Sequence, residues 1–134
     1  MLNSSPQAGA FAAYKKAATE TARPERLLIM LFDGGIKFLF QAQSALAEKD
    51  YEKANNLMIK VQEILWTLMD TLNFEQGGDI AKNLYSLYSF YRREVMQANI
   101  EKNGERLIPV LKFFQSYRET WTKAALKAMA EKDK

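Results

Sequence analysis

The chain has 134 residues, 48% of them hydrophobic, which is enough for one domain to bury a sizeable core without disulfides or a structural metal. It contains no cysteine and no histidine, which excludes disulfide frameworks, Cys/His zinc sites and mechanisms that need a histidine base. The 19 basic and 16 acidic residues are interspersed, and a net charge of +3 favours a solvated surface over a nucleic-acid-binding one.

The N-terminal part is expected to be a flexible segment, residues 1–20, ahead of a helical domain at residues 21–130. Residues 1–10 are small and polar, lack the features of a secretory signal peptide and are expected to be disordered. Residues 11–20 can form a short helix with Phe11, Tyr14 and Ala18 on one face, but so short a helix is marginal in water. It is interpreted either as a tail packed on the domain or as a movable lid over an apolar groove.

A long helix is predicted for residues 24–48, because Pro24 and Glu25 suit a first helical turn. It carries two apolar faces, more than one buried stripe requires, so neighbouring helices surround it or a partner completes its burial. The paired Gly34 and Gly35 indicate either close packing of a neighbouring helix or a thin wall that a partner segment approaches. One face holds Leu28, Leu31, Gly35, Leu39, Ala42 and Leu46, and the other Ile29, Phe32, Ile36 and Phe40.

The second and third helices are predicted at residues 51–72 and 79–100. Asp50 is a suitable N-cap for the second, whose apolar spacing is regular and leaves Trp66 at an edge. Residues 73–78 contain paired glycines and are expected to end the second helix and separate it from the third. The third helix should face the core with Ile80, Leu84, Leu87, Tyr91, Val95 and Ala98, flanked by a strip of Tyr85, Tyr88 and Arg92.

The fourth helix is predicted at residues 105–129, where Pro109 marks a later start or kinks the helix. No segment alternates like a strand, and apolar runs of about six residues are too short to span a membrane. Four helices with short connections predict an all-α fold, an antiparallel up-down four-helix bundle. The inward residues of the fourth helix are expected to be Leu107, Leu111, Phe114, Trp121 and Ala125, with either Tyr117 or Arg118.

Little catalytic chemistry is available, so the chain is expected to be no enzyme and to hold no metal or cofactor. A di-iron site of Glu-x-x-His pairs needs histidine, and the glycine pairs lack the spacing of a phosphate loop. Asp33 lies among apolar residues, and it is interpreted either as a surface or inter-helix polar contact or as a polar anchor for a bound peptide. The apolar excess favours capture of an amphipathic peptide in a groove, and self-association as a homodimer is the alternative. Nucleic-acid binding is disfavoured, since acidic residues accompany the basic ones.

Four blocks of the sequence resemble the FliS-type flagellar secretion chaperone family. The first is Tyr14 followed by TARPERLLIMLFDGGIKFL at residues 21–39, and the second is TLNFEQGGDIAKNLYSLYSFYRR at residues 71–93. The third is the Ala98-Asn99 pair, and the fourth is LIPVLKFFQSYRETW at residues 107–121. The chain departs from the usual pattern at three positions, and none of these departures removes apolar surface. They are Arg23 for serine, Phe32 for tyrosine and Gly35 for alanine.

The resemblance implies a cytosolic export chaperone that binds the disordered C-terminal segment of flagellin, prevents premature polymerisation and delivers flagellin to the export apparatus. Other flagellar export or regulatory proteins are further expected partners, and no membrane insertion is implied. Phe11 and Tyr14 would cover the groove when the client is absent, while Asp33 and Asn99 would contact the client backbone. Groove or core would be built, without a division between the two, from Leu27, Leu28, Met30, Leu31, Phe32, Ile36, Leu84, Leu87, Tyr88 and Tyr91.

Overall fold

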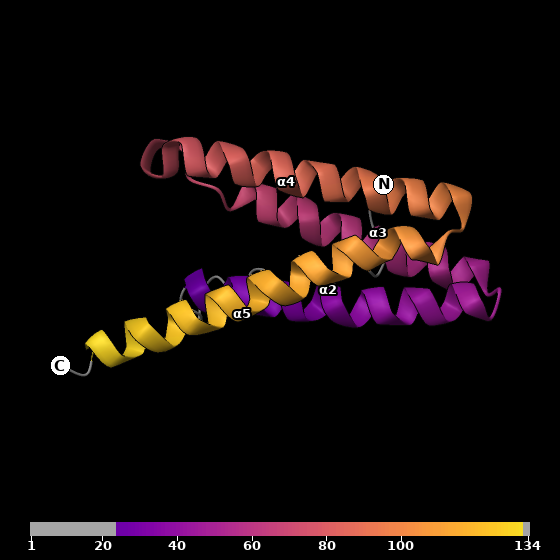
Figure 1. Cartoon of the computed structure of the whole chain (residues 1–134), viewed down its shortest axis with the longest axis horizontal. Coiled ribbons are helices and arrows are strands. Elements are labelled where there is room, and N and C mark those ends of the chain that lie inside the picture. Colours follow the sequence, from indigo (N-terminus) through magenta and orange to yellow (C-terminus); the bar gives the residue numbers. More distant parts are fainter. Residues whose placement is uncertain (1–23, 133–134) are drawn as a thin grey trace, which may run out of the picture.

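The computed structural model describes residues 24–132, which form four long α-helices joined by short turns (Figure 1). Successive helices run in opposite directions, so the predicted all-α bundle is confirmed, and residues 24–132 contain no strand. A short 3₁₀ helix, η1 (Gly104–Arg106), precedes the last of them. The four helices are α2 (Pro24–Ala47), α3 (Tyr51–Asp70), α4 (Phe74–Glu101) and α5 (Leu107–Lys132).

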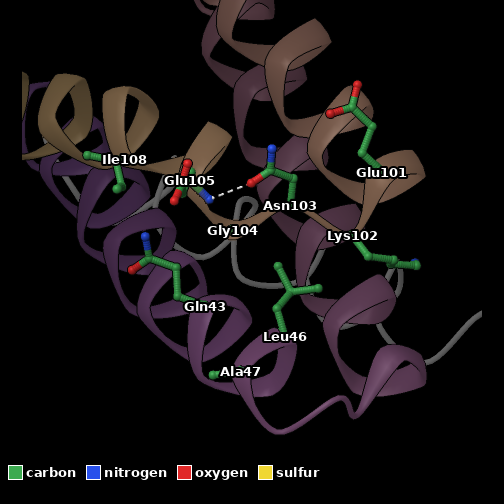
Figure 2. A pocket seen from close by; sticks show the side chains of 9 residues that line it. All are labelled: Gln43, Leu46, Ala47, Glu101, Lys102, Asn103, Gly104, Glu105 and Ile108. Atoms are coloured by element: carbon green, nitrogen blue, oxygen red, sulfur yellow. Dashed lines mark hydrogen bonds between the residues drawn. The ribbon is translucent and has the colours of Figure 1, made fainter.

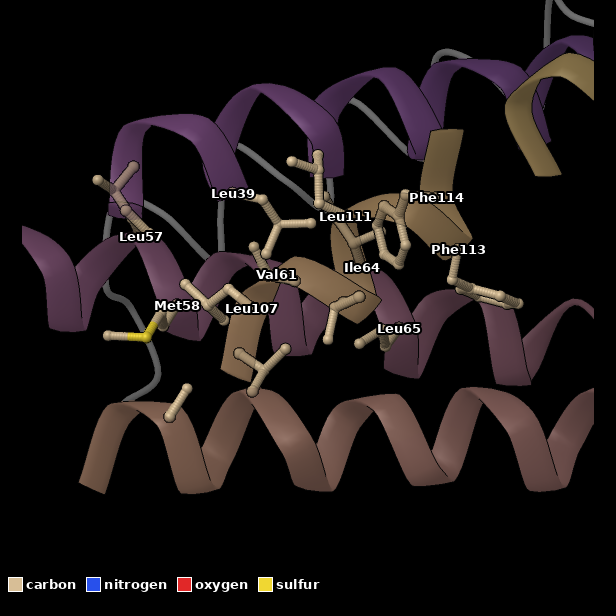
Figure 3. Close-up of a cluster of buried hydrophobic side chains, with 14 of the residues drawn as sticks. Leu39, Leu57, Met58, Val61, Ile64, Leu65, Leu107, Leu111, Phe113 and Phe114 are labelled. Carbon is tan, nitrogen blue, oxygen red and sulfur yellow. The ribbon is translucent and has the colours of Figure 1, made fainter. Parts of the chain in front are cut away.

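The hydrophobic core is built from side chains of α2, α3, α4 and α5, and α4 packs mainly against α3 (Figure 3). Both predicted faces of α2 contribute, because Leu31 and Leu39 from one face and Phe32 from the other are fully buried. Phe40, at the end of the second face, is instead about half exposed. The side chains labelled in Figure 3 are Leu39, Leu57, Met58, Val61, Ile64, Leu65, Leu107, Leu111, Phe113 and Phe114.

Gly35 allows α5 to lie directly against α2. A Cβ atom at Gly35 would overlap the ring of the fully buried Phe114. A Cβ at Gly34 would meet Ile64 Cδ1 at 3.6 Å, an ordinary contact distance. Of the two interpretations of the glycine pair, close packing of a neighbouring helix is therefore correct for Gly35.

The structure begins α4 earlier than the sequence predicted, at Phe74 and not at residue 79. Asn73 caps this first turn, because its side chain accepts a hydrogen bond of 3.0 Å from the Gln76 N–H. Gly78 then breaks the helix with φ 50° and ψ −125°, so the glycine pair interrupts the helix from within.

The break at Gly78 folds the first turn of α4 back on the rest of the helix. The rings of Phe74 and Tyr85 lie 5.9 Å apart between centroids. In an unbroken helix, residues eleven positions apart are separated by about 16 Å along the axis. The contact between these two rings therefore depends on the change of direction at Gly78.

The predicted core face of α4 is correct at Val95 and Ala98, which are fully buried, and wrong by about one residue at Ile80 and Leu87. Tyr88, placed in the flanking strip, is 1% exposed, whereas Leu87 and Ile80, placed in the core face, are 36% and 72% exposed. The observed face holds Ala81, Tyr88, Val95 and Ala98. The reason is aromatic packing, since the Tyr88 ring meets the edge of the Phe113 ring at 5.9 Å, a contact that Leu87 could not make.

Pro109 lies in the first turn of α5, because η1 takes up residues 104–106 and α5 begins at Leu107. The missing N–H of proline has no intrahelical acceptor at this position, so Pro109 marks a later start of the helix. Further along, Tyr117 packs against the core and Arg118 stays exposed.

The helices α4 and α5 approach each other only at one end of the bundle. They are close near the turn at Lys102 and diverge toward the opposite end (Figure 1). Contacts of α5 are mostly with α2, and it shares far fewer with α4. The divergence leaves the first half of α4 and the second half of α5 separated at their facing sides.

We predict that Gly78→Ala lowers the free energy of unfolding by about 1–3 kcal/mol, since a side chain strongly disfavours this backbone conformation. Urea denaturation followed by circular dichroism measures the change. Gly34→Ala is the matched control, because its Cβ has room within a regular helix and removing a helical glycine is favourable by up to about 1 kcal/mol. A Gly78→Ala variant as stable as the control would contradict the requirement for glycine.

Candidate functional site

An apolar groove lies where α4 and α5 diverge, and we call it the α4–α5 groove. Its volume is about 320 Å³. Leu28 of α2 contributes its side chain to the lining, and residues of the connection between α3 and α4 also line the groove. The described residues that line it are Leu28, Thr71, Leu72, Asn73, Gln76, Gly77, Ile80, Ala81, Leu84, Tyr88 and Trp121.

The chemistry of the α4–α5 groove is that of a site for apolar side chains. Its described lining contains no Asp, Glu, Lys or Arg, and only Asn73 and Gln76 offer side-chain amides. Ile80 is 72% exposed at the groove, and Trp121 is partly buried. Such a surface can bury aliphatic or aromatic side chains of a ligand, while the two amides can bond its backbone.

Tyr88 is the one described lining residue of the groove with an ionisable side chain, and burial keeps it neutral. Desolvation of the buried phenol raises the pKa of Tyr88 far above its usual range, and the nearby Tyr117 phenol raises it further. The ring therefore acts as a neutral, largely apolar wall throughout the physiological pH range.

A cluster of aromatic rings centred on Phe113 joins α2, α4 and α5 beneath the groove. Tyr91 stacks on Phe113 at 4.3 Å between centroids, and Tyr117 lies at 4.4 Å. Phe32 of α2 meets the edge of Phe113 at 6.4 Å. Phe113 was absent from the predicted inward face of the fourth helix. A second stripe, Val110, Phe113, Tyr117 and Trp121, spaced by three and four residues, would have indicated it.

Asp33 forms an ion pair with Arg118 that links α2 to α5. Both side chains are substantially exposed, so solvent screens the pair and its contribution to stability is about 0–1 kcal/mol. This contact is the inter-helix polar contact of the two alternatives considered for Asp33. The role of Asp33 as a peptide anchor stays a proposal. A bound peptide would have to compete with Arg118 for the Asp33 carboxylate.

The remaining predicted site residues divide into core and surface. Leu31, Phe32 and Tyr88 are buried, whereas Leu87 is partly exposed on α4. Leu28, Leu84 and Tyr88 line the groove. The partly buried residues packed against the core include Leu27, Leu28, Ile36, Leu84 and Tyr91, and Met30 is also partly buried.

Asn99 lies away from the α4–α5 groove and already has partners within the chain. Its side chain donates to Asn55 Oδ1 at 2.8 Å and accepts from Lys102 Nζ at 2.8 Å. It therefore links α3 to α4. Phe11 and Tyr14 lie outside the described residues.

The outer side of α3 and α4 carries two further hollows that share the exposed Trp66. One of about 280 Å³ is lined by Trp66, Met69, Asp70, Leu72, Phe74 and Tyr85, and the other of about 380 Å³ by Ile59, Gln62, Glu63, Trp66 and Arg92. The Arg92 guanidinium lies 5.8 Å from the Trp66 ring, and its Nε has no hydrogen-bond partner. Desolvation raises the pKa of Glu63, an effect that Lys60 partly offsets.

Another hollow, of about 660 Å³, lies at the other end of the bundle between the end of α2 and the turn after α4 (Figure 2). Some of its polar groups build that turn. Asn103 Oδ1 accepts from the Glu105 N–H at 3.0 Å, and Arg106 holds Glu101 at 3.0 Å. Hydrogen bonds from Arg106 and Gln97 lower the pKa of Glu101. The hollow is thus framed in part by hydrogen bonds and an ion pair that hold the turn.

Within residues 24–132, no group of three or more Asp or Glu side chains is placed to hold a metal ion. None of the described helices combines the length and hydropathy needed to cross a membrane.

Comparison with known proteins identifies the family. The sequence profile of the flagellar protein FliS matches residues 7–128. The chain belongs to the FliS family. It is 31% identical over 114 residues to the flagellar secretion chaperone FliS of Bacillus subtilis, covering 85% of this chain and 84% of that protein. The FliS of Vibrio cholerae is 31% identical over 117 residues, covering 84% of this chain and 86% of the relative.

A third relative, the flagellar secretion chaperone FliS of Salmonella typhimurium, is 31% identical over 114 residues, covering 84% of each chain. The expectation of a FliS-type flagellar export chaperone is thereby confirmed, and a chaperone family implies a role other than catalysis. Of the four hollows described above, the α4–α5 groove is the one whose described lining carries no charged side chain.

We predict that Tyr88→Phe makes the protein more resistant to alkaline pH. The folded-state pKa of Tyr88 is raised above its ordinary value of 10.0, so its contribution to stability is present below pH 10 and lost as pH rises further. Urea denaturation at pH 7 and pH 10.5 measures the loss for both proteins. The variant should lose less stability than the parent. Equal losses would contradict a buried, neutral phenol.

Proposed function

We propose that this FliS-family chaperone binds the disordered C-terminal segment of flagellin, and that the α4–α5 groove receives an amphipathic helix of that segment. The groove's apolar lining supports this proposal, because it suits the apolar face of a helix that folds on binding. Binding in the cytosol would prevent premature polymerisation of flagellin and present it to the flagellar export apparatus.

The single observation that carries the proposal is the uncovered apolar surface between α4 and α5. Ile80 is 72% exposed beside Leu84 and Trp121, where solvation of apolar surface is unfavourable. A folding client would bury about 1,000–3,000 Å² in total, far more than one groove provides. Other exposed aromatic surface, including the hollows around Trp66, would supply the rest of a long binding path.

We further propose that residues 11–20 act as a lid when no client is bound. The spacing of Phe11 and Tyr14 would place both on one face of a helix, and the segment precedes Leu28, a lining residue of the groove, by only a few residues in the sequence. Replacing both aromatic residues with alanine should increase binding of an apolar dye to the free protein and strengthen client binding. If dye binding and client affinity both stay unchanged, the lid is wrong.

The alternative partner is a second copy of the chain, since the same apolar surface could support a homodimer. Other flagellar export or regulatory proteins remain additional proposed partners. Sedimentation of the protein alone at several concentrations tests for self-association. The mean molecular mass would rise with protein concentration if the chain formed a dimer.

Calorimetric titration with a synthetic peptide of the flagellin C-terminus from the same bacterium tests the function. We expect stoichiometric binding, a negative heat-capacity change and a gain of helix by circular dichroism. Ile80→Asp should weaken binding about tenfold or more, because it removes apolar contact and places a carboxylate against apolar surface.

Ile100→Asp is the matched control. Ile100 is 74% exposed on the same helix but lies outside the groove, so this change should leave the affinity within about twofold. Absence of heat and of added helix with a folded protein would sink the flagellin proposal. Equal weakening of peptide binding by both variants would instead show that the client does not bind in the α4–α5 groove.

A further inference from the structure

The position of α5 is set mainly by its contact with α2. This contact depends on two residues of complementary size, one small and one large. Gly35 presents bare backbone, and the ring of Phe114 occupies the space that a Cβ would fill. Gly35 and Phe114 are both buried. A glycine at a helix contact lets the partner helix approach more closely than any other residue would.

The Phe114 ring is fully buried and packs against two other aromatic rings. It meets Phe32 edge-on at 5.3 Å and Phe113 at 6.0 Å between centroids. Close-packed interiors accommodate an added methyl group by shifting backbone or neighbouring side chains. A side chain at residue 35 would therefore displace α5 from α2.

The Gly35–Phe114 contact lies two helical turns from the α4–α5 groove. Leu28 precedes Gly35 by seven residues on α2, and Trp121 follows Phe114 by seven residues on the antiparallel α5. Residues seven apart share a helix face, so Leu28 and Trp121 repeat the same pairing along the interface. Both line the groove.

We propose that Gly35 and Phe114 are positioning residues that hold α5 against α2 and thereby set the width of the α4–α5 groove between Leu28 and Trp121. The Asp33–Arg118 ion pair lies between these two levels and restrains α5 in the same place. The pair of residues thus determines which side chains of a bound segment the groove admits. This consequence for binding rests on the proposed function, whereas the geometry does not.

Spin-label distance measurements test the geometry without any client. The chain has no natural cysteine, so labels can be placed at Arg26→Cys on α2 and Lys123→Cys on α5, both exposed and beside the groove. Gly35→Ala should lengthen this distance by about 1–2 Å, since carbon atoms require about 3.5–4.0 Å. Labels at Lys53→Cys and Arg93→Cys, exposed positions on α3 and α4, should keep their spacing.

Rescue distinguishes a matched pair from general destabilisation. Phe114→Leu alone should lower stability by leaving a cavity while keeping the labelled distance near that of the parent. In the double variant Gly35→Ala with Phe114→Leu, the labelled distance should return to the parental value. If Gly35→Ala does not fold, the double variant decides: folding with the parental distance supports the pair, and failure to fold contradicts it.

The flagellin peptide then separates this inference from the proposed function. Gly35→Ala should bind it about tenfold more weakly than the parent, and the double variant should recover most of that affinity. A parent protein that binds no peptide refutes the function and leaves the distance result standing. A parent that binds, with an unchanged distance in Gly35→Ala, overturns the positioning role alone.

Discussion

The burial of two faces of α2 is the constraint on which the arrangement of the other helices depends. Both faces contact α5, since Gly35 of one face and Phe32 of the other pack against Phe114, and α2 also packs extensively against α3. Phe32 meets the rings of Phe113 and Phe114 from α5. Because α5 is held so closely to α2, it makes far fewer contacts with α4, among them those of the Phe113 ring with Tyr88 and Tyr91. The uncovered side of α4 then becomes the α4–α5 groove.

Ring packing, more than charge, determines how α5 is held. Removing a buried aromatic side chain costs about 3–5 kcal/mol, whereas an exposed ion pair such as Asp33–Arg118 contributes about 0–1 kcal/mol. Phe114, fully buried against Gly35, therefore carries more of the energy than the polar link beside it. The same hierarchy suits a chaperone, since a rigid α2–α5 contact can hold a groove open while its lining stays apolar and solvated.

The sequence was sufficient for the all-α class and the antiparallel order, because apolar spacing and turn residues are local signals. The Asp50 cap and the core face of α3 follow from the same signals. The rotation of α4 does not, since the choice between Leu87 and Tyr88 depends on the position of Phe113 on another helix. The sequence did not predict its earlier start at Phe74, because the glycine pair is typical of a turn although Gly78 here breaks a longer helix from within. The apolar excess indicated a groove, but the division into core and lining needed the path of α5.

The central claim, that the client occupies the α4–α5 groove, is tested most directly by hydrogen exchange of the backbone amides with and without the flagellin peptide. Amides near Ile80 and Leu84 on α4, and near Trp121 on α5, should exchange more slowly in the complex, because these residues line the groove. Amides at the opposite end, near Gly104, should change little. Protection confined to that end or to the α3 side around Trp66 would contradict the account.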